Sequence, residues 1–216
     1  MPCCYSEDKD KSERSGILSL SEILGVLNCF IERLNILLPE ATFSAAIIGG
    51  LAVVAHGYMR TTNDIDLAVL IEKKETPRYK TSYEEDTKII RKIESLFNQD
   101  LFPELISLLR SKDAIHVSVP RPFSSEPFPN GILAFPLKSG KFKRADFIFC
   151  LYEWQKDAVK NARIPVENNP WKFYFPIITL IDLLIMKMCA GSLKDRNDVV
   201  QLYRYCSEEE KEILKT

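Results

Sequence analysis

Apolar residues recur at intervals of three and four over residues 19–38, which predicts an amphipathic helix with one buried face. Ser19 or Ser21 supplies its N-cap, and Pro39 ends it. A short apolar run over residues 43–48 then meets a Gly-Gly pair, as expected of a buried strand that enters a tight turn. The apolar positions of the helix are Ile23, Leu24, Leu27, Phe30, Leu34 and Leu37.

The next two elements differ in period. Residues 51–58 are mostly apolar and predict a short helix that stops near Gly57. Residues 64–71 alternate, with Ile65, Leu67 and Val69 on one face, which predicts a strand. We expect further helices at 82–96, 103–110, 152–162, 177–190 and 195–205, and further strands at 115–119, 132–137 and 142–151.

This order of elements predicts an α/β (α+β) fold. Strands and helices mix over residues 17–160, and residues 161–216 form a helical C-terminal portion that we expect to pack on the same domain. Residues 1–16 are small, polar and charged, so we expect a disordered tail.

Charge and hydropathy exclude several classes of protein. Lys and Arg number 29 against 30 Asp and Glu, so a generally basic surface for nucleic acid is excluded, although a local basic cleft is not. The longest apolar run, residues 177–186, contains Asp182 and is too short to span a bilayer. The N-terminus has no apolar stretch typical of a signal peptide. We therefore expect a soluble, cytoplasmic protein without membrane contact.

The six cysteines do not form a disulfide or zinc pattern. Cys3 and Cys4 are adjacent in the predicted tail, where metal binding or acylation stays open. The other four lie in apolar segments and are predicted to be reduced: Cys29, Cys150, Cys189 and Cys206.

The chemistry is concentrated in residues 47–70, IIGGLAVVAHGYMRTTNDIDLAVL. Gly49-Gly50 at the start of a helix exposes backbone N–H groups without side-chain obstruction, so that a phosphate can approach closely. Asp64 and Asp66, two apart on a strand, point to one face and repel each other unless a cation lies between them. Because Mg²⁺ is commonly held by one or two carboxylates and substrate phosphates, the pattern indicates a triphosphate handled with a divalent metal.

Each half of this pattern also has an ordinary structural explanation. A Gly-Gly pair before a helix is often only a tight turn, and an Asp-x-Asp pair is usually a solvated strand face. Their combination on neighbouring elements is more specific than either alone. The Walker loop and the dinucleotide-binding fingerprint are both missing.

The stretch resembles the signature of the polymerase-beta-like nucleotidyltransferase superfamily, in which a Gly-Gly or Gly-Ser turn opens a helix and the next strand carries Asp-x-Asp. The longer string, with His56-Gly57, Arg60, Thr62 and Asp64-Ile-Asp66, is similar to AbiEii-type and related minimal nucleotidyltransferases. The resemblance implies a mixed sheet flanked by helices. It also implies a Mg²⁺ (or Mn²⁺) site at Asp64 and Asp66.

The resemblance extends to two later segments. Asp146, in the strand-like RADFIF, matches the third carboxylate, which would hold metal and accept a proton from the attacking hydroxyl; the alternative is an ordinary exposed Asp. Lys187 matches a habitual lysine, and a buried ammonium needs an anion such as triphosphate unless it snorkels to the surface. The Lys-Asp-x-x-Asp segment at 194–198 follows, where Asp195 is equally explained as an N-cap and Asp198 as an acidic residue of the first turn.

Further residues are candidates to bind nucleotide. The resemblance assigns phosphate to Gly49-Gly50. The guanidinium of Arg60 suits phosphate oxygens, or else pairs with Asp64 or Asp66. Thr62 would hydrogen-bond phosphate or order the turn into the strand.

The resemblance implies metal-dependent transfer of a nucleoside monophosphate from an NTP to a hydroxyl of RNA, tRNA or protein. The resemblance also implies a toxin role with an antitoxin partner. The alternative is a non-catalytic nucleotide- or partner-binding protein that retains the fold. Which NTP, which acceptor and what oligomeric state are not determined by the sequence.

Overall fold

The computed structural model describes residues 19–73, 83–97, 99, 101–111, 115–118, 131–138, 140–164 and 175–215. The predicted tail at 1–16 lies outside these residues, and so do Cys3 and Cys4. The helices are α1 (Leu20–Leu37), α2 (Gly49–Ala55), α3 (Tyr83–Phe97), α4 (Pro103–Leu108), α5 (Glu153–Asn161), α6 (Leu180–Ala190), α7 (Leu193–Leu202), η2 (Tyr203–Tyr205) and α8 (Glu208–Ile213). The strands are β1 (Ala41–Ile48), β2 (Asp64–Lys73), β3 (His116–Ser118), β4 (Gly131–Pro136) and β5 (Arg144–Phe149).

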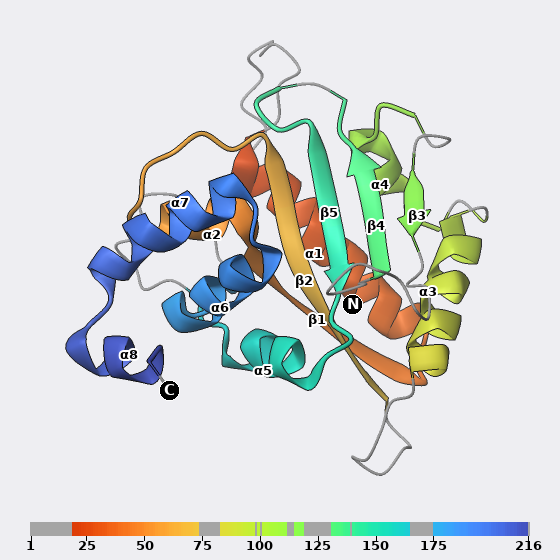
Figure 1. Ribbon diagram of the computed structural model, residues 1–216. Helices are drawn as coiled ribbons and strands as arrows, with labels where there is room; N and C mark the ends of the chain where they lie inside the picture. The colour runs from red at the N-terminus through yellow and green to blue at the C-terminus, as the bar shows by residue number, and fades with distance from the viewer. Residues whose placement is uncertain are drawn as a thin grey trace.

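The strands form one mixed sheet in the order β1-β2-β5-β4-β3 (Figure 1). β2 and β5 are parallel neighbours at its centre, and the other neighbouring pairs are antiparallel. The two central strands are buried along most of their length, as their apolar composition predicts. The prediction of an α/β (α+β) fold with a mixed sheet flanked by helices is confirmed.

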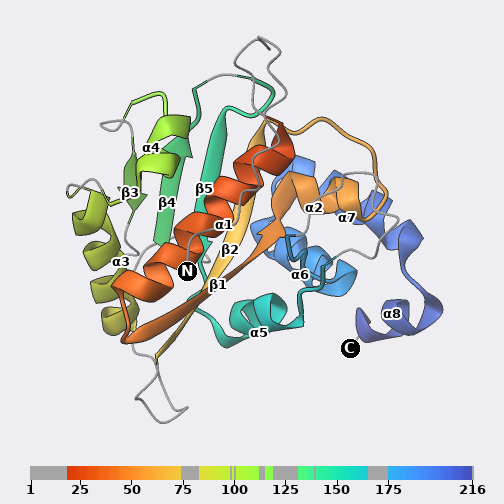
Figure 2. The same cartoon turned by 180° about the vertical axis from the view of Figure 1, so that it is seen from behind.

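Helix α1 covers one face of the sheet (Figure 2). It begins where the sequence predicts, because the Ser19 side chain accepts the Glu22 N–H and the Glu22 carboxylate accepts the Ser19 N–H, which together form a capping box. Its buried Phe30 packs edge-on against Phe147 of β5 and Phe135 of β4, with ring centroids 5.3 and 5.6 Å away. This aromatic layer fills the face of β5 opposite to Asp146.

Helices α5 and α6 lie on the other side of the sheet (Figure 1). The segment before α6 is tied to β1, because Ile47 N–H donates to Pro176 O over 2.7 Å. His56, the C-cap of α2, places its Nε2 2.8 Å from Ile178 O, and burial lowers its pKa. These contacts fix α2 and α6 beside the edge of the sheet formed by β1.

Several element bounds differ from the predictions. Helix α2 begins at Gly49 instead of residue 51. Helix α6 begins at Leu180 instead of residue 177, because Thr179 caps it and Ile177 forms bridges with Ile47 and Arg163. Helix α8 was not predicted from the sequence, although Ser207 and Glu210 form a capping box at its start.

Two predictions about the chain as a whole bear on the described residues. Cys29, Cys150, Cys189 and Cys206 are free, as predicted. In the part of the chain that the structure describes, no helix has both the length and the apolarity that crossing a membrane requires.

Candidate active site

The register of β2 and β5 brings three acidic residues onto one face of the sheet. Asp66 lies directly opposite Asp146, and Asp64 lies opposite Arg144. Because side chains on a strand alternate between faces, Asp64, Asp66 and Asp146 point to the same side. Asp146 is buried, and the other two are half-buried. Parallel pairing therefore places the carboxylate from the later strand beside the Asp-x-Asp pair.

The environment disfavours ionisation of two of these groups. Burial raises the pKa of Asp66, and the neighbouring Asp64 raises it further. Burial raises the pKa of Asp146 to about 6, against the opposing charge of Arg144. The Nη2 of Arg144 lies 2.7 Å from Oδ2 of Asp146, whereas the buried Oδ1 has no hydrogen-bond partner among the described residues. One acceptor oxygen is thus left for a further ligand.

The donors at this site suit a hard divalent cation, which prefers oxygen ligands. Within the described ranges, no group of three or more His, Cys, Asp or Glu side chains is arranged to hold a metal ion as it stands. Mg²⁺ is usually held by one or two carboxylates, with substrate phosphates and water completing its shell, so a protein cage of three ligands is not required. Asp66 and Asp146, with the unpartnered Oδ1 of Asp146, fit this kind of site.

The Gly-Gly turn packs directly on the site. Gly49 has φ +60°, and a Cβ atom there would lie 2.7 Å from Cγ of Asp66. A Cβ atom on Gly50 would lie 2.8 Å from Cβ of Thr62, and a backbone hydrogen bond from Gly50 lowers the pKa of Asp66 against the effect of burial. Only glycines allow so close an approach, so the packing of the turn against Asp66 and Thr62 explains both glycines.

Two predicted phosphate ligands lie in the segment that enters β2. Thr62 is buried, and its hydroxyl donates to Asp64 O over 3.2 Å, so that it orders the turn into the strand. Arg60 Nε lies 3.0 Å from Oδ1 of Asp198 on α7. The ion pair of Arg60 is therefore with Asp198 and not with Asp64 or Asp66.

Lys187 is buried, and the chain itself supplies its anions. Its Nζ lies 2.7 Å from Oδ1 of Asp195 and 3.0 Å from Oδ2 of Asp198, and the Asp198 side chain has no exposed surface. Burial raises the pKa of Asp195, but hydrogen bonds from Lys187 and Ser192 outweigh burial and hold this pKa below its usual value. Lys187 does not snorkel to the surface.

Neither Asp195 nor Asp198 has the helix-end role considered from the sequence. Ser192 is the N-cap of α7: its hydroxyl accepts the Asp195 N–H over 3.1 Å and donates to the Asp195 carboxylate over 2.6 Å. Asp198 lies in the interior between Arg60 and Lys187. These four charged residues form a network that joins α6 and α7 to the segment before β2, and we call them the charged network.

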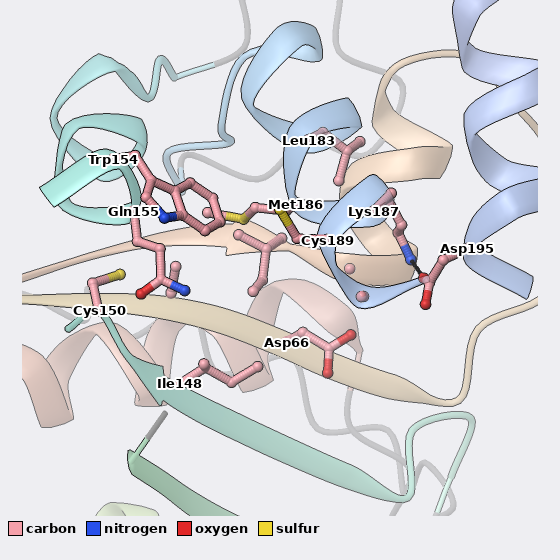
Figure 3. A pocket seen from close by; sticks show the side chains of 14 residues that line it. Asp66, Ile148, Cys150, Trp154, Gln155, Leu183, Met186, Lys187, Cys189 and Asp195 are labelled. Atoms are coloured by element: carbon pink, nitrogen blue, oxygen red, sulfur yellow. Dashed lines mark hydrogen bonds and ion pairs between the residues drawn. The ribbon is translucent and has the colours of Figure 1, made fainter. Parts of the chain in front are cut away.

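A cavity of about 470 Å³ opens beside the carboxylates (Figure 3). Of the predicted site residues, Gly49, Asp66 and Lys187 line it, while Asp64, Asp146, Gly50, Arg60 and Thr62 are not among its described lining residues. Most residues that form its walls were not predicted from the sequence. These are Ile48, Ala68, Ile148, Cys150, Trp154, Gln155, Leu183, Met186, Cys189, Ala190 and Asp195.

One signal in the sequence points to part of these walls. Asp146, Ile148 and Cys150 alternate along one strand, so the face that carries the third carboxylate also carries the next two lining residues. Trp154, which no pattern in the sequence marked as a site residue, is half-buried and lines the cavity. The walls supplied by α6 depend on helix packing and have no such signal.

No protein-family model matches the chain, and no curated protein sequence matches it. Three solved structures are similar at low identity. An antigenic nucleotidyltransferase-like protein from Paracoccidioides brasiliensis is 18% identical with a TM-score of 0.40, over 92% of this chain and 88% of that one. A putative nucleotidyltransferase from Thermotoga maritima is 15% identical with a TM-score of 0.38, over 88% and 98%. A cytoplasmic RNA terminal U-transferase is 14% identical with a TM-score of 0.31, over 81% of this chain and 42% of that one.

Proposed function

We propose that this chain is a metal-dependent nucleotidyltransferase, which moves a nucleoside monophosphate from an NTP to a hydroxyl acceptor. The observation that carries the proposal is the register of β2 and β5, which sets Asp66 beside Asp146 on the face that opens to the cavity. Carboxylates that are buried together, with one acceptor oxygen unpartnered, favour a cationic ligand. Mg²⁺ or Mn²⁺ bound by Asp64, Asp66 and Asp146 would neutralise the triphosphate and polarise its α-phosphorus.

The side chains of the site have distinct parts in this reaction. Asp146 accepts the proton of the acceptor hydroxyl, because its Oδ1 has no hydrogen-bond partner among the described residues and is available as an acceptor. The acceptor oxygen then bonds to the α-phosphorus, and the bond from that phosphorus to the bridging oxygen breaks and releases pyrophosphate. Lys187, at the wall of the cavity, supplies positive charge to the phosphates, with Gly49 leaving room for their approach.

An exposed basic turn supports RNA as the acceptor. Lys138, Lys141 and Lys143 are exposed directly before Arg144, whose register partner is Asp64. A polyanion held on this turn would have its hydroxyl close to the carboxylates. A protein hydroxyl is the other acceptor class, and a toxin role with an antitoxin partner rests on the sequence resemblance alone.

One observation favours a second function. Arg144 pairs with Asp146, and Asp195 and Asp198 pair with Lys187, so that the charges proposed to act on metal and phosphate already have internal partners. A non-catalytic nucleotide- or partner-binding protein would keep this arrangement. It predicts that nucleotide binds without turnover.

The test is to incubate the purified protein with Mg²⁺, each α-labelled NTP and either total RNA or cell lysate. The Asp64→Asn/Asp66→Asn variant is compared with Glu72→Gln, which alters an exposed carboxylate on the same strand. Label on RNA from the wild type and Glu72→Gln, but not from the double variant, supports the proposal, and label on protein changes the acceptor. Binding of NTP without any label favours the second function, and no binding at all refutes both.

A further inference from the structure

The cavity has two chemically different ends. Figure 3 shows Lys187 and Asp195 at one end, with Asp66 on the sheet near them, and Trp154, Cys150 and Gln155 at the other. The second end is mostly apolar, and Ile148 and Met186 continue its wall toward the middle of the cavity. Burial raises the pKa of the Cys150 thiol to about 12, so it is a neutral part of the wall. A ligand that fills the whole cavity is therefore charged at one end and apolar at the other.

The sheet sets the separation of the two ends. Asp146, Ile148 and Cys150 share one face of the chain, and the Cys150 N–H continues the β2–β5 pairing by donating to Val69 O over 2.8 Å. Four residues of extended chain span about 13 Å. In Figure 3, Trp154 and Gln155 of α5 face Met186 and Cys189 of α6 across the apolar end. The indole offers an apolar face on which a planar ring can stack, and the flexible Met186 side chain can adapt to it.

Gln155 presents a fixed hydrogen-bond donor at this end. Its Oε1 accepts two backbone N–H groups, from Leu151 over 3.1 Å and from Tyr152 over 3.3 Å. Because both neighbours are donors, the atom that faces them is the amide oxygen, and the Nε2 group is directed into the cavity (Figure 3). Gln155 is 6% exposed and lines the cavity, and the hydrogen bonds that tie its side chain to the described residues are the two that Oε1 accepts. The site therefore offers an oriented amide donor against an apolar wall.

We propose that the apolar end binds the base of the NTP and that Gln155 selects bases with a carbonyl on the edge farthest from the ribose. This inference rests on the proposed nucleotidyl transfer, because it takes the triphosphate to lie at the end with Asp66 and Lys187. The base then enters the apolar end with the edge opposite its glycosidic bond foremost. That edge carries a carbonyl in uracil and guanine and an amino group in cytosine and adenine.

The donor character of Gln155 gives this choice its energetic basis. A carbonyl accepts from Nε2, whereas an amino group would bring two donors together and leave both unpaired in an apolar wall. Leaving a buried donor unpaired weakens binding by roughly 10-fold or more. Trp154 adds stacking that does not depend on the base, so the wild-type protein should bind UTP and GTP more tightly than CTP and ATP.

The experiment measures the dissociation constants of the four NTPs, as analogues with a non-hydrolysable α,β bond, by calorimetry with Mg²⁺. Gln155→Glu keeps an oxygen for the Leu151 and Tyr152 N–H groups and turns the free donor into an acceptor. The matched control is Gln201→Glu on α7, where Oε1 accepts only from Arg204. The readout is the ratio of dissociation constants, UTP against CTP and GTP against ATP, because the added charge weakens the binding of all four NTPs alike.

We expect roughly 10-fold preferences for UTP and GTP in the wild type and the control, and the opposite preferences in Gln155→Glu. Binding with no base preference would overturn the inference and leave nucleotidyl transfer standing. A preference that Gln155→Glu does not reverse would remove Gln155 from base selection. If none of the four NTPs binds, the inference falls together with the proposed function.

Discussion

Asp198 is the residue of the charged network whose removal tests its energetics most directly. The carboxylate has no exposed surface and pairs with two cations, Nε of the half-buried Arg60 and Nζ of the buried Lys187, each 3.0 Å away. Asp198→Asn removes the charge with almost no change in shape. Lys187 keeps Asp195 at 2.7 Å, whereas Arg60 loses its anion.

The expected loss of stability follows from this difference. Removing one partner of a buried ion pair costs roughly 3–5 kcal/mol, because the other charge is left uncompensated. Neither carboxylate oxygen of Asp198 has hydrogen-bond geometry with its partner, and Arg60 is the cation that would lose its carboxylate in the variant. We therefore take the lower end of this range of energies. The unfolding free energy should fall by roughly 3 kcal/mol, which lowers Tm by roughly 6–12 °C in a chain of this size.

Urea denaturation followed by circular dichroism measures this loss, with Asp195→Asn as the matched control. The amide introduced by this control still offers an oxygen to Lys187, which also keeps Asp198, so the control should lose only roughly 1 kcal/mol. Replacing Arg60 and Asp198 together by Met and Leu removes both charges and should be more stable than Asp198→Asn. A loss for Asp198→Asn no larger than that of the control would refute the reasoning.

Three further predictions concern the carboxylates and the turn. Without divalent cations, Asp146 should make stability fall by roughly 2–3 kcal/mol as pH rises from about 4 to about 6, because the native state holds its proton more tightly than the unfolded chain does. Asp146→Asn should reduce this fall in denaturation curves across pH and leave the part that comes from Asp66, whose pKa is also raised. Mg²⁺ should raise the Tm of the wild type at pH 7 but not that of Asp66→Asn, and an equal rise in both would place the ion elsewhere. Gly49→Ala should abolish transfer and destabilise more than Gly191→Ala, which has a similar φ of +67° but nothing within 3.4 Å of its Cβ; equal losses in urea denaturation would mean that φ alone explains Gly49.

The local elements follow from the sequence where periodicity and caps agree. Residues 20–37 carry an apolar face and a capping box, and the helix forms over those residues. The predicted start of α6 was wrong because an apolar run such as residues 177–186 fits a buried helix and a buried extended segment equally well. Contacts of Ile177 with Ile47 and Arg163, which no local pattern encodes, decide between them.

The Asp-x-Asp pair, the Gly-Gly turn and the alternation around Asp146 are properties of short segments, so the sequence by itself determined them. Whether Asp146 stands beside Asp66 depends on which strands pair and in what register, and the sheet decided that. The ion-pair partners of Arg60 and Lys187 come from α7, and the periodicity within one element cannot predict contacts between separate elements. The apolar end of the cavity likewise exists only because α5 and α6 come together with Ile148 and Cys150, since a wall made of separate elements has no signature in any one of them.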